Sequence, residues 1–311
     1  MDYIDADVAY LLGLIVARGT LVEREQVRQL IIEFPYSSLH LRGESSEFDQ
    51  ETEISLGLHS IRSRLADLLE ADIEIVHRQT SADLVVRFLR NNMVWRNLRL
   101  LLDDKTAYPD FHIPRVLLQP DLPRDWKVQF VRGFADVAGN IRHANRYVDG
   151  RHRVRLDVLN SRHNWALPVQ LCSLLQEHIG VPVQLINWGH PNMGRAFREH
   201  QIDVFAEPFL QVGFSFRHKQ KVLEEFAEQD RQRYPNASYR PCPALRRIRK
   251  QKDPDPAEND ANYLDARLVG KHFDAYFQIC RELGCQQLRS NTEEAELFTD
   301  EVEAEASGEQ T

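Results

Sequence analysis

The chain has little cysteine, and its cysteines form no recognisable site. Four cysteines among 311 residues are too few for a disulfide framework in a chain of this length. There is no CxxC pair, so the usual signature of a zinc site is missing. One set of potential zinc ligands remains, formed by Cys242, Cys280 and Cys285 together with His272. We favour the alternative, that these cysteines are buried, reduced thiols.

Long hydrophobic runs are missing too. No apolar stretch approaches the roughly 20 residues that a membrane-spanning helix needs. The opening residues, MDYIDADVAY, lack the basic region of a signal peptide. With 42% hydrophobic and 28% charged residues, the composition is typical of a globular protein, and the length suffices for one large or two ordinary domains. We therefore expect a soluble, cytoplasmic protein with no membrane partner.

Net positive charge, which many nucleic-acid-binding proteins carry, is also absent, because the formal net charge is −8. All of this net negative charge comes from residues 293–311, which contain eight acidic residues and neither lysine nor arginine. The rest of the chain is neutral overall, so only local asymmetry of charge can indicate a partner. We expect the acidic segment to be disordered and solvating. The alternative is that it competes with DNA for a basic surface.

Two nine-residue stretches, LLGLIVARG and VRGFADVAG, suggest that the chain contains two related halves. Gly13 and Gly19 lie six residues apart in the first stretch, and Gly133 and Gly139 repeat that spacing in the second. Each half then predicts a helix, two strands, a helix, two strands and a helix, which indicates an internal duplication. The first half predicts helices at 7–17, 60–69 and 93–102, strands at 27–36, 72–78 and 83–89, and a polar loop at 42–53.

The second half predicts helices at 126–138, 165–178 and 218–228, and strands at 181–187 and 201–205. Between its first two helices, alternating residues on both sides of Asp149 and Gly150 predict a β-hairpin with a two-residue turn. The resulting domains are a first lobe at 1–105, a proline-rich linker at 106–125, a second lobe at 126–233, a C-terminal extension with one helix at 234–292, and the acidic tail at 293–311.

In these two stretches the chain resembles the two-motif, single-chain homing endonucleases named for their LAGLIDADG helix. Both nonapeptides align with that motif without gaps, and the resemblance covers about residues 5–230. It implies an α+β fold of two pseudo-symmetric αββαββα lobes with saddle-shaped antiparallel sheets. It also implies that the motif helices pack against each other between the lobes, with Gly13, Gly19, Gly133 and Gly139 at that packing.

The two acids that hold catalytic metal in this family are missing from this sequence. The matching positions carry Arg18 and Ala138, and neither an always charged guanidinium nor a methyl group can coordinate Mg²⁺. Asp136 matches an earlier, non-catalytic acid of the motif, and we expect it to form structural hydrogen bonds. A displaced metal site using Glu23 or Asp136 is the alternative. No cofactor is therefore expected, except Mg²⁺ in that alternative.

Arg18 suggests a change of role, because a planar guanidinium suits phosphate. We expect Arg18 to bind a DNA phosphate near the symmetry axis. The alternative is a helix-end arginine paired with an acid such as Asp136.

The hairpin after the second motif gives the main indication of nucleic acid. Strand alternation predicts one core face and one arginine face, which in the family lies in the DNA major groove. The resemblance thus implies DNA contacts by Arg142, Arg146, Arg151, Arg153 and Arg155, for which a solvated strand face is the alternative. It implies a further phosphate contact by Lys219, for which a plain helix-surface lysine is the alternative. A basic cluster at 246–252 is either a DNA-binding arm or a charged linker.

These observations predict a monomeric protein that binds double-stranded DNA on a LAGLIDADG scaffold and has lost cleavage. Two alternatives remain: an active site-specific endonuclease with a non-standard metal site, and an RNA-binding, maturase-like splicing cofactor. The C-terminal extension or the acidic tail could also recruit a protein partner.

Overall fold

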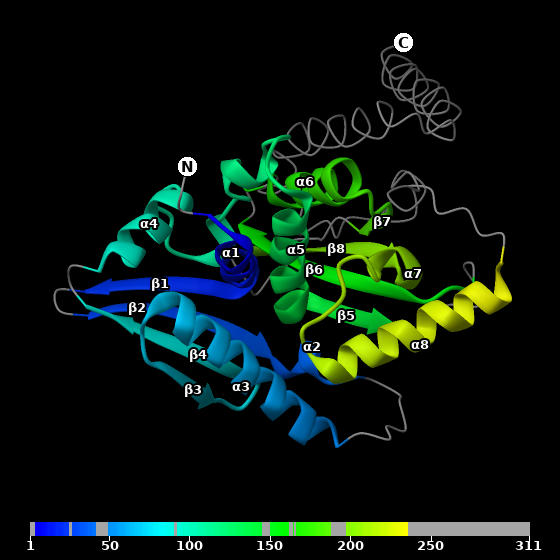
Figure 1. Cartoon of the computed structure of the whole chain (residues 1–311), viewed down its shortest axis with the longest axis horizontal. Coiled ribbons are helices and arrows are strands. Elements are labelled where there is room, and N and C mark those ends of the chain that lie inside the picture. The colour runs from blue at the N-terminus through cyan, green and yellow to red at the C-terminus, as the bar shows by residue number, and fades with distance from the viewer. Residues whose placement is uncertain are drawn as a thin grey trace, which may run out of the picture.

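The computed structural model describes residues 4–24, 27–41, 49–89, 92–144, 150–161, 164, 166–187 and 197–235. These residues form two lobes, each built on a four-stranded antiparallel sheet (Figure 1). The predicted zinc ligands, the basic cluster at 246–252, the C-terminal helix, the acidic tail and Arg146 lie outside the described residues. No helix in the described part of the chain is long and apolar enough to cross a membrane.

The first lobe contains residues 6–101. Its elements are α1 (Ala6–Arg18), β1 (Gly19–Arg24), β2 (Val27–Pro35), the one-turn α2 (Tyr36–Leu39), α3 (Gln50–Leu69), β3 (Ile73–His77), β4 (Ser81–Phe88) and α4 (Met93–Leu101). The sheet order is β1-β2-β4-β3. Two short 3-10 turns, η1 (Tyr108–Asp110) and η2 (Arg115–Leu118), follow in the connection between the lobes.

The second lobe repeats this plan. Its elements are α5 (Arg124–Ala138), β5 (Gly139–Arg142), β6 (Arg153–Ser161), α6 (Ala166–Ser173) with a π-helical end at Leu174–Ile179, β7 (Val183–Asn187), β8 (Phe197–Phe205), the one-turn α7 (Ala206–Phe209) and α8 (Arg217–Arg233). The sheet order β5-β6-β8-β7 matches that of the first lobe. The predicted α+β fold with two pseudo-symmetric lobes is therefore confirmed.

Helices α1 and α5 pack against each other where the lobes meet. Both are lined with small and apolar residues, and most of their side chains are buried. A Cβ atom added to Gly13 would lie 2.0 Å from the carbonyl oxygen of Phe130, and one added to Gly133 would lie 2.2 Å from that of Tyr10. Only glycine permits such an approach of two backbones. The predicted role of these two glycines in packing between the lobes thus has a direct structural cause.

The other two motif glycines act differently from the prediction. Added Cβ atoms at Gly19 and Gly139 would meet Ile15 and Ala135 of their own helices, at 2.7 and 2.5 Å. Both residues are extended and begin a strand directly after the motif helix. They allow a sharp change from helix to strand within a lobe, so we do not assign them to the contact between the lobes.

Helix α3 begins ten residues earlier than predicted, so the prediction of a loop at 42–53 is wrong for its last four residues, 50–53. Buried Ile54 and Leu58 continue the helical spacing of Ile61 and Leu65. Thr52 also donates a 2.6 Å hydrogen bond to Asp49, the residue before the helix. Acidic residues in the first turn favour a helix N-terminus, although their polarity made the segment resemble a loop.

The proline-rich connection is part of the packed structure. The backbone N–H of Leu21 donates to the carbonyl of Thr106 at 2.7 Å, and Thr20 forms a bridge with Ala107. Phe111 and Leu117 are fully buried. The segment therefore extends the edge of the first sheet beside β1 and contributes to the core.

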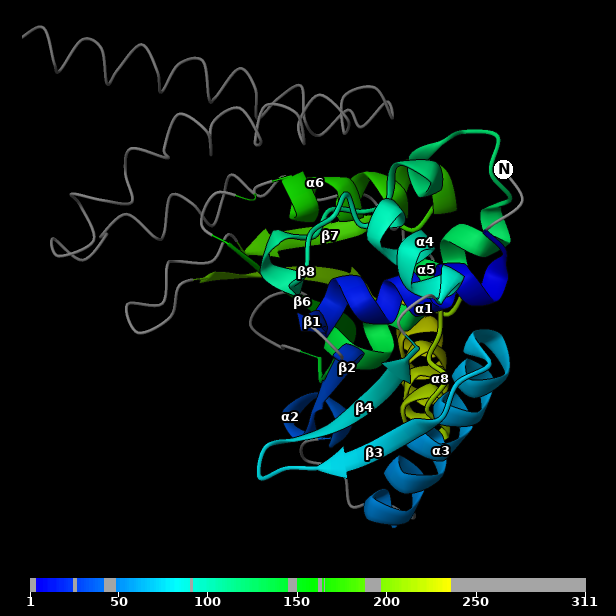
Figure 2. The ribbon, with the colours of Figure 1, turned by 90° about the vertical axis from the view of Figure 1, so that its left-hand side faces the viewer.

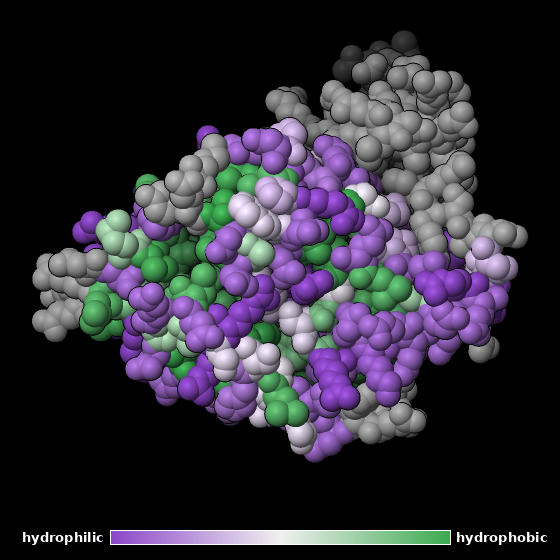
Figure 3. All heavy atoms as spheres, viewed as in Figure 1, coloured by the Kyte–Doolittle hydropathy of each residue, from purple (hydrophilic) through white to green (hydrophobic). Residues whose placement is uncertain are grey.

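Helices α3 and α8 lie on the same side of the two sheets (Figure 2). Helix α8 also reaches the first lobe, because Nε2–H of the buried His218 ring donates a 2.9 Å hydrogen bond to the carbonyl of Leu39. The outer face of α8 is mostly hydrophilic (Figure 3), while Leu223 and Ala227 of its inner face are fully buried. The interface between the two lobes thus involves α8 as well as the motif helices α1 and α5.

Candidate functional site

The ends of α1 and α5 occupy the positions where the resemblance places two metal-binding acids. Ala138 is buried and carries no ligand atom. The guanidinium carbon of Arg18 lies 5.5 Å from the centre of the Tyr108 ring, a cation–π distance. Among the described residues, no group of three or more histidine, cysteine, aspartate or glutamate side chains is placed to hold a metal ion.

Asp136 has the structural role that the sequence predicted. Its carboxylate accepts a 2.7 Å hydrogen bond from the hydroxyl of Tyr10 and a 2.9 Å hydrogen bond from the backbone N–H of Ser215. Burial raises the pKa of Asp136, and these hydrogen bonds oppose that rise. Because Tyr10 belongs to α1, the aspartate joins the two lobes. The alternative pairing of Arg18 with Asp136 is wrong, since Arg18 turns to Tyr108.

Glu23 does not take part in a metal site with Asp136. Its carboxylate forms ion pairs with Arg28 at 2.9 Å and with Arg99 of α4 at 2.8 Å. These partners hold Glu23 beside α4, while Asp136 is enclosed in the packing between the lobes. The displaced metal site therefore gains no support from the geometry of these two acids.

Lys219 is completely buried, so the predicted contact with a DNA phosphate is wrong. Its ammonium donates a 2.8 Å hydrogen bond to the carbonyl of Gly139 and lies 4.6 Å from the Phe214 ring. Burial lowers the pKa of Lys219 to about 8, although the nearby Asp136 charge opposes this change. The lysine thus stabilises the junction between α5 and β5 from inside the protein.

The core face of β6 agrees with the alternation prediction, but the predicted two-residue turn is wrong. Val154, Leu156 and Val158 are fully buried, whereas the β5–β6 register pairs Arg142 with Arg153. The strands are thus joined by residues 143–152. The backbone N–H of His152 donates to Asp230 of α8, and the His152 ring contacts the same carboxylate, both at 2.8 Å. This anchor fixes the chain before β6.

Three of the predicted DNA-binding arginines contact other parts of the protein. The guanidinium carbons of Arg151 and Arg153 lie 5.0 and 5.4 Å from the Phe205 ring centre, and Arg153 is only 7% exposed. Arg155 forms a 2.8 Å ion pair with Asp157. Arg153 is therefore poorly placed to reach a ligand outside the protein, while Arg155 keeps about a fifth of its side chain exposed.

The strand register puts acidic residues on the predicted arginine face. Asp203 of β8 is opposite Arg155, and Glu199 of the same strand is opposite Leu159. Together with Asp157 on β6, they match Arg142, Arg153 and Arg155 in number on this face of the second sheet. The described strands of this face are thus formally neutral, which the hairpin sequence alone did not indicate.

A cavity of about 270 Å³ lies between the lobes beside the end of α1, and sequence reasoning missed it. We call it the junction cavity. Arg18 lines it together with two further arginines, Arg142 and Arg155, from the second lobe. Its other lining residues are Ser37, Ser38, His40 and Leu41 from the first lobe and Asn140, Ile141, Asp157, Leu159 and Glu199 from the second.

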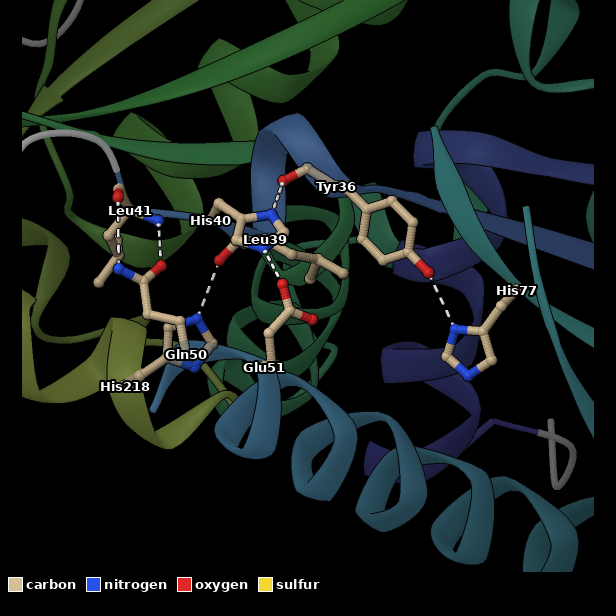
Figure 4. A network of polar contacts seen from close by, with 8 residues as sticks. All are labelled: Tyr36, Leu39, His40, Leu41, Gln50, Glu51, His77 and His218. Atoms are coloured by element: carbon tan, nitrogen blue, oxygen red, sulfur yellow. Dashed lines mark hydrogen bonds and ion pairs between the residues drawn. The ribbon is translucent and has the colours of Figure 1, made fainter. Parts of the chain in front are cut away.

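Hydrogen bonds fix the first-lobe wall of the junction cavity (Figure 4). One ring nitrogen of His40 contacts the carbonyl of Tyr36 and the other contacts Glu51 of α3, both at 2.9 Å. Burial opposes protonation of His40, but its contacts with Glu51 and with the Tyr36 carbonyl raise its pKa overall. The side chain of Gln50 accepts a 3.0 Å hydrogen bond from the backbone N–H of Leu41. Sequence offered no signal for this wall, because it joins residues of separate elements.

No protein-family model and no curated protein sequence matches the chain. Among solved structures, the homing endonuclease I-DmoI in complex with DNA and Ca is 16% identical, with 71% of this chain and 97% of that chain covered and a TM-score of 0.41. The full-length DUF199/WhiA protein from Thermatoga maritima is 12% identical, with 86% and 69% covered and a TM-score of 0.39. The N-terminal LAGLIDADG domain of DUF199/WhiA is 15% identical, with 65% and 78% covered and a TM-score of 0.33. The chain is thus similar to LAGLIDADG proteins, the family that its motif helices resemble.

Proposed function

We propose that this protein binds double-stranded DNA without cutting it. The proposal is carried by the end of α1, where a half-buried arginine takes the place of a metal-binding acid and lines a cavity between the lobes. A guanidinium can meet a backbone phosphate with two hydrogen bonds. The LAGLIDADG resemblance supports duplex DNA as the ligand, and the motif positions lack the carboxylates that a hydrolytic metal needs.

The distribution of charge predicts a modest contact with DNA. The open face of the second sheet is formally neutral among the described strands, so Arg18, Arg142 and Arg155 carry the proposed phosphate contacts. Three contacts correspond to a slope of about −2.7 for the logarithm of affinity against the logarithm of salt concentration. A broad basic surface would give a steeper dependence.

The test combines binding and cleavage on the full-length protein. We would incubate it with a random duplex library at low salt, with Mg²⁺ or with EDTA, and sequence the bound and the cut molecules. The proposal predicts enriched, uncut sites that bind equally well in EDTA. Metal-dependent cuts at one site would establish the nuclease alternative, and a preference for structured RNA competitor would establish the maturase-like alternative.

Variants then test the role of the arginine. Arg18→Ala should weaken binding to all enriched sites to a similar extent and reduce the salt slope by about 1. Arg62→Ala is the matched control, because Arg62 is exposed on α3 and lines a different hollow, at the edge strand β3. Equal affinity and salt slope in Arg18→Ala and in the unaltered protein would remove the phosphate role.

A further inference from the structure

The junction cavity has the dimensions of a small-ligand site. Its volume of about 270 Å³ corresponds to about nine molecules of liquid water, which is near the lower end for ligand pockets. Arg18 and His40 line it from the first lobe, while Asn140 and Arg155 line it from the second. A ligand in this cavity would therefore contact both lobes at once.

The lining is rich in hydrogen-bond donors. Guanidinium groups donate and never accept, and three of them line the cavity from α1, β5 and β6. Within the described part of the chain, the Nε–H of Arg18 is buried and has no hydrogen-bond acceptor. A buried donor that has no partner within the chain can be satisfied by an acceptor from outside it. An oxygen atom of a ligand in the cavity would supply this acceptor, and the three arginines favour negative charge on such a ligand.

Two carboxylates limit how much negative charge the cavity can take. Asp157 is held by Arg155 at 2.8 Å and by the side-chain amide of Asn140 at 2.6 Å, and Glu199 also lines the cavity. Both would repel a polyphosphate chain. A single phosphate group beside Arg18 and Arg142 fits the volume and the charge better.

We infer that the junction cavity binds one phosphate group of a small ligand, either inorganic phosphate or a nucleoside monophosphate. The Nε–H of Arg18, which has no acceptor within the described chain, donates a hydrogen bond to this phosphate. Arg142 and Arg155 line the same cavity. A further consequence rests on the proposed function: a free phosphate compound in this cavity competes with the DNA backbone for Arg18.

Calorimetric titration of the full-length protein with inorganic phosphate and with deoxyadenosine 5′-monophosphate tests the inference. Deoxyadenosine without phosphate is the matched ligand control. Arg18→Gln should weaken binding of both phosphate compounds at least about tenfold, since a hydrogen bond to a charged group is lost. Arg62→Gln should leave their affinity unchanged.

A second variant should raise the affinity for phosphate, a result that a misfolded protein cannot give. Asp157→Asn keeps the size of the side chain and removes one negative charge from the cavity wall. It should tighten phosphate binding about fivefold, the effect of one unit charge at about 4 Å in water. The two variants together separate a specific site from general damage to the protein.

Several outcomes overturn the inference. They are the absence of binding by both phosphate compounds, equal binding of deoxyadenosine, and affinities that Arg18→Gln and Asp157→Asn leave unchanged. DNA binding measured in phosphate-free buffer decides the proposed function separately. If the protein binds DNA but neither phosphate compound, this inference is refuted and the proposed function stands. If it binds a phosphate compound but not DNA, the proposed function is refuted and this inference stands.

Discussion

The Gly13→Ala substitution tests whether close contact between α1 and α5 holds the lobes in place. In an isolated helix, alanine is favoured over glycine by about 1 kcal/mol. Without the contact between helices, the substitution should therefore stabilise the protein. A loss of stability can come only from the added methyl group, so the sign of the change is informative.

The structure indicates that the loss is large. The new Cβ would lie 2.0 Å from the carbonyl oxygen of Phe130 and 2.9 Å from the backbone nitrogen of Phe134. A carbon normally stays about 3.3 Å or more from a carbonyl oxygen, so the helices must separate by about 1 Å. Overpacking costs about 1–3 kcal/mol, and backbone atoms cannot rotate away. We expect a clash of about 3 kcal/mol and a net loss of about 2 kcal/mol after the gain in helix propensity.

Thermal and urea unfolding of the full chain, followed by circular dichroism, measures this loss. For about 150–250 folded residues, 2 kcal/mol corresponds to a decrease in Tm of about 4–8 °C. Gly133→Ala should behave alike, because its Cβ would meet Tyr10 at 2.2 Å. The double variant should lose less than the sum of the single losses, since the first alanine already separates the helices.

Gly180→Ala is the control for a substitution that strains the backbone without a clash. Gly180 has a φ of 78°, and nothing lies within 4 Å of an added Cβ. The Gly180→Ala protein should be less stable by about 1–2 kcal/mol, because alanine is strained in a left-handed backbone conformation. In a double variant with Gly13→Ala, the two losses of stability should be additive. A Gly13→Ala protein as stable as the unaltered one would refute the argument that these glycines fix the lobes.

Three further substitutions test buried polar groups, each by urea unfolding. The folded pKa of Lys219, about 8, lies below its ordinary value of 10.5, so the unfolded chain binds more protons between these values and stability falls as pH falls from 9 to 7. In the Lys219→Met protein, the fall in the free energy of unfolding between pH 9 and pH 7 should be smaller by roughly 1 kcal/mol. An unchanged dependence of stability on pH would contradict a buried lysine with a lowered pKa. Burial lowers the pKa of His218, so the free energy of unfolding falls as pH drops below about 6.5. The His218→Gln protein should lose stability less steeply in that range. Equal dependence of stability on pH in the variant and the unaltered protein would argue against a buried neutral imidazole. Asp230→Asn should cost about 1–3 kcal/mol because the carboxylate accepts two hydrogen bonds from His152, whereas Asp67→Asn at an exposed position of α3 should change little; equal losses in both would show that the anchor is unimportant.

The amino-acid sequence alone determined the two-lobe plan and the loss of the motif acids. Motif spacing and strand alternation are local properties, because each depends on the repeat of a helix or strand. They gave the motif helices, the core face of β6 and the presence of Arg18 and Ala138 where acids are expected. The close approach at Gly13 and Gly133 also followed, since a small residue repeated in two apolar helices suggests helix contact.

Tertiary structure decided what surrounds each charge. Lys219 resembled a surface lysine of a helix, yet packing encloses it beside Gly139. The arginines of the hairpin resembled a basic face, but the β8 register places Asp203 opposite Arg155 and Glu199 on the same face of the sheet. The junction cavity combines residues more than 100 positions apart, such as Arg18 and Arg155. Periodicity shows which face a side chain occupies within its own element, but charge balance and cavities depend on how separate elements come together, which only the folded chain defines.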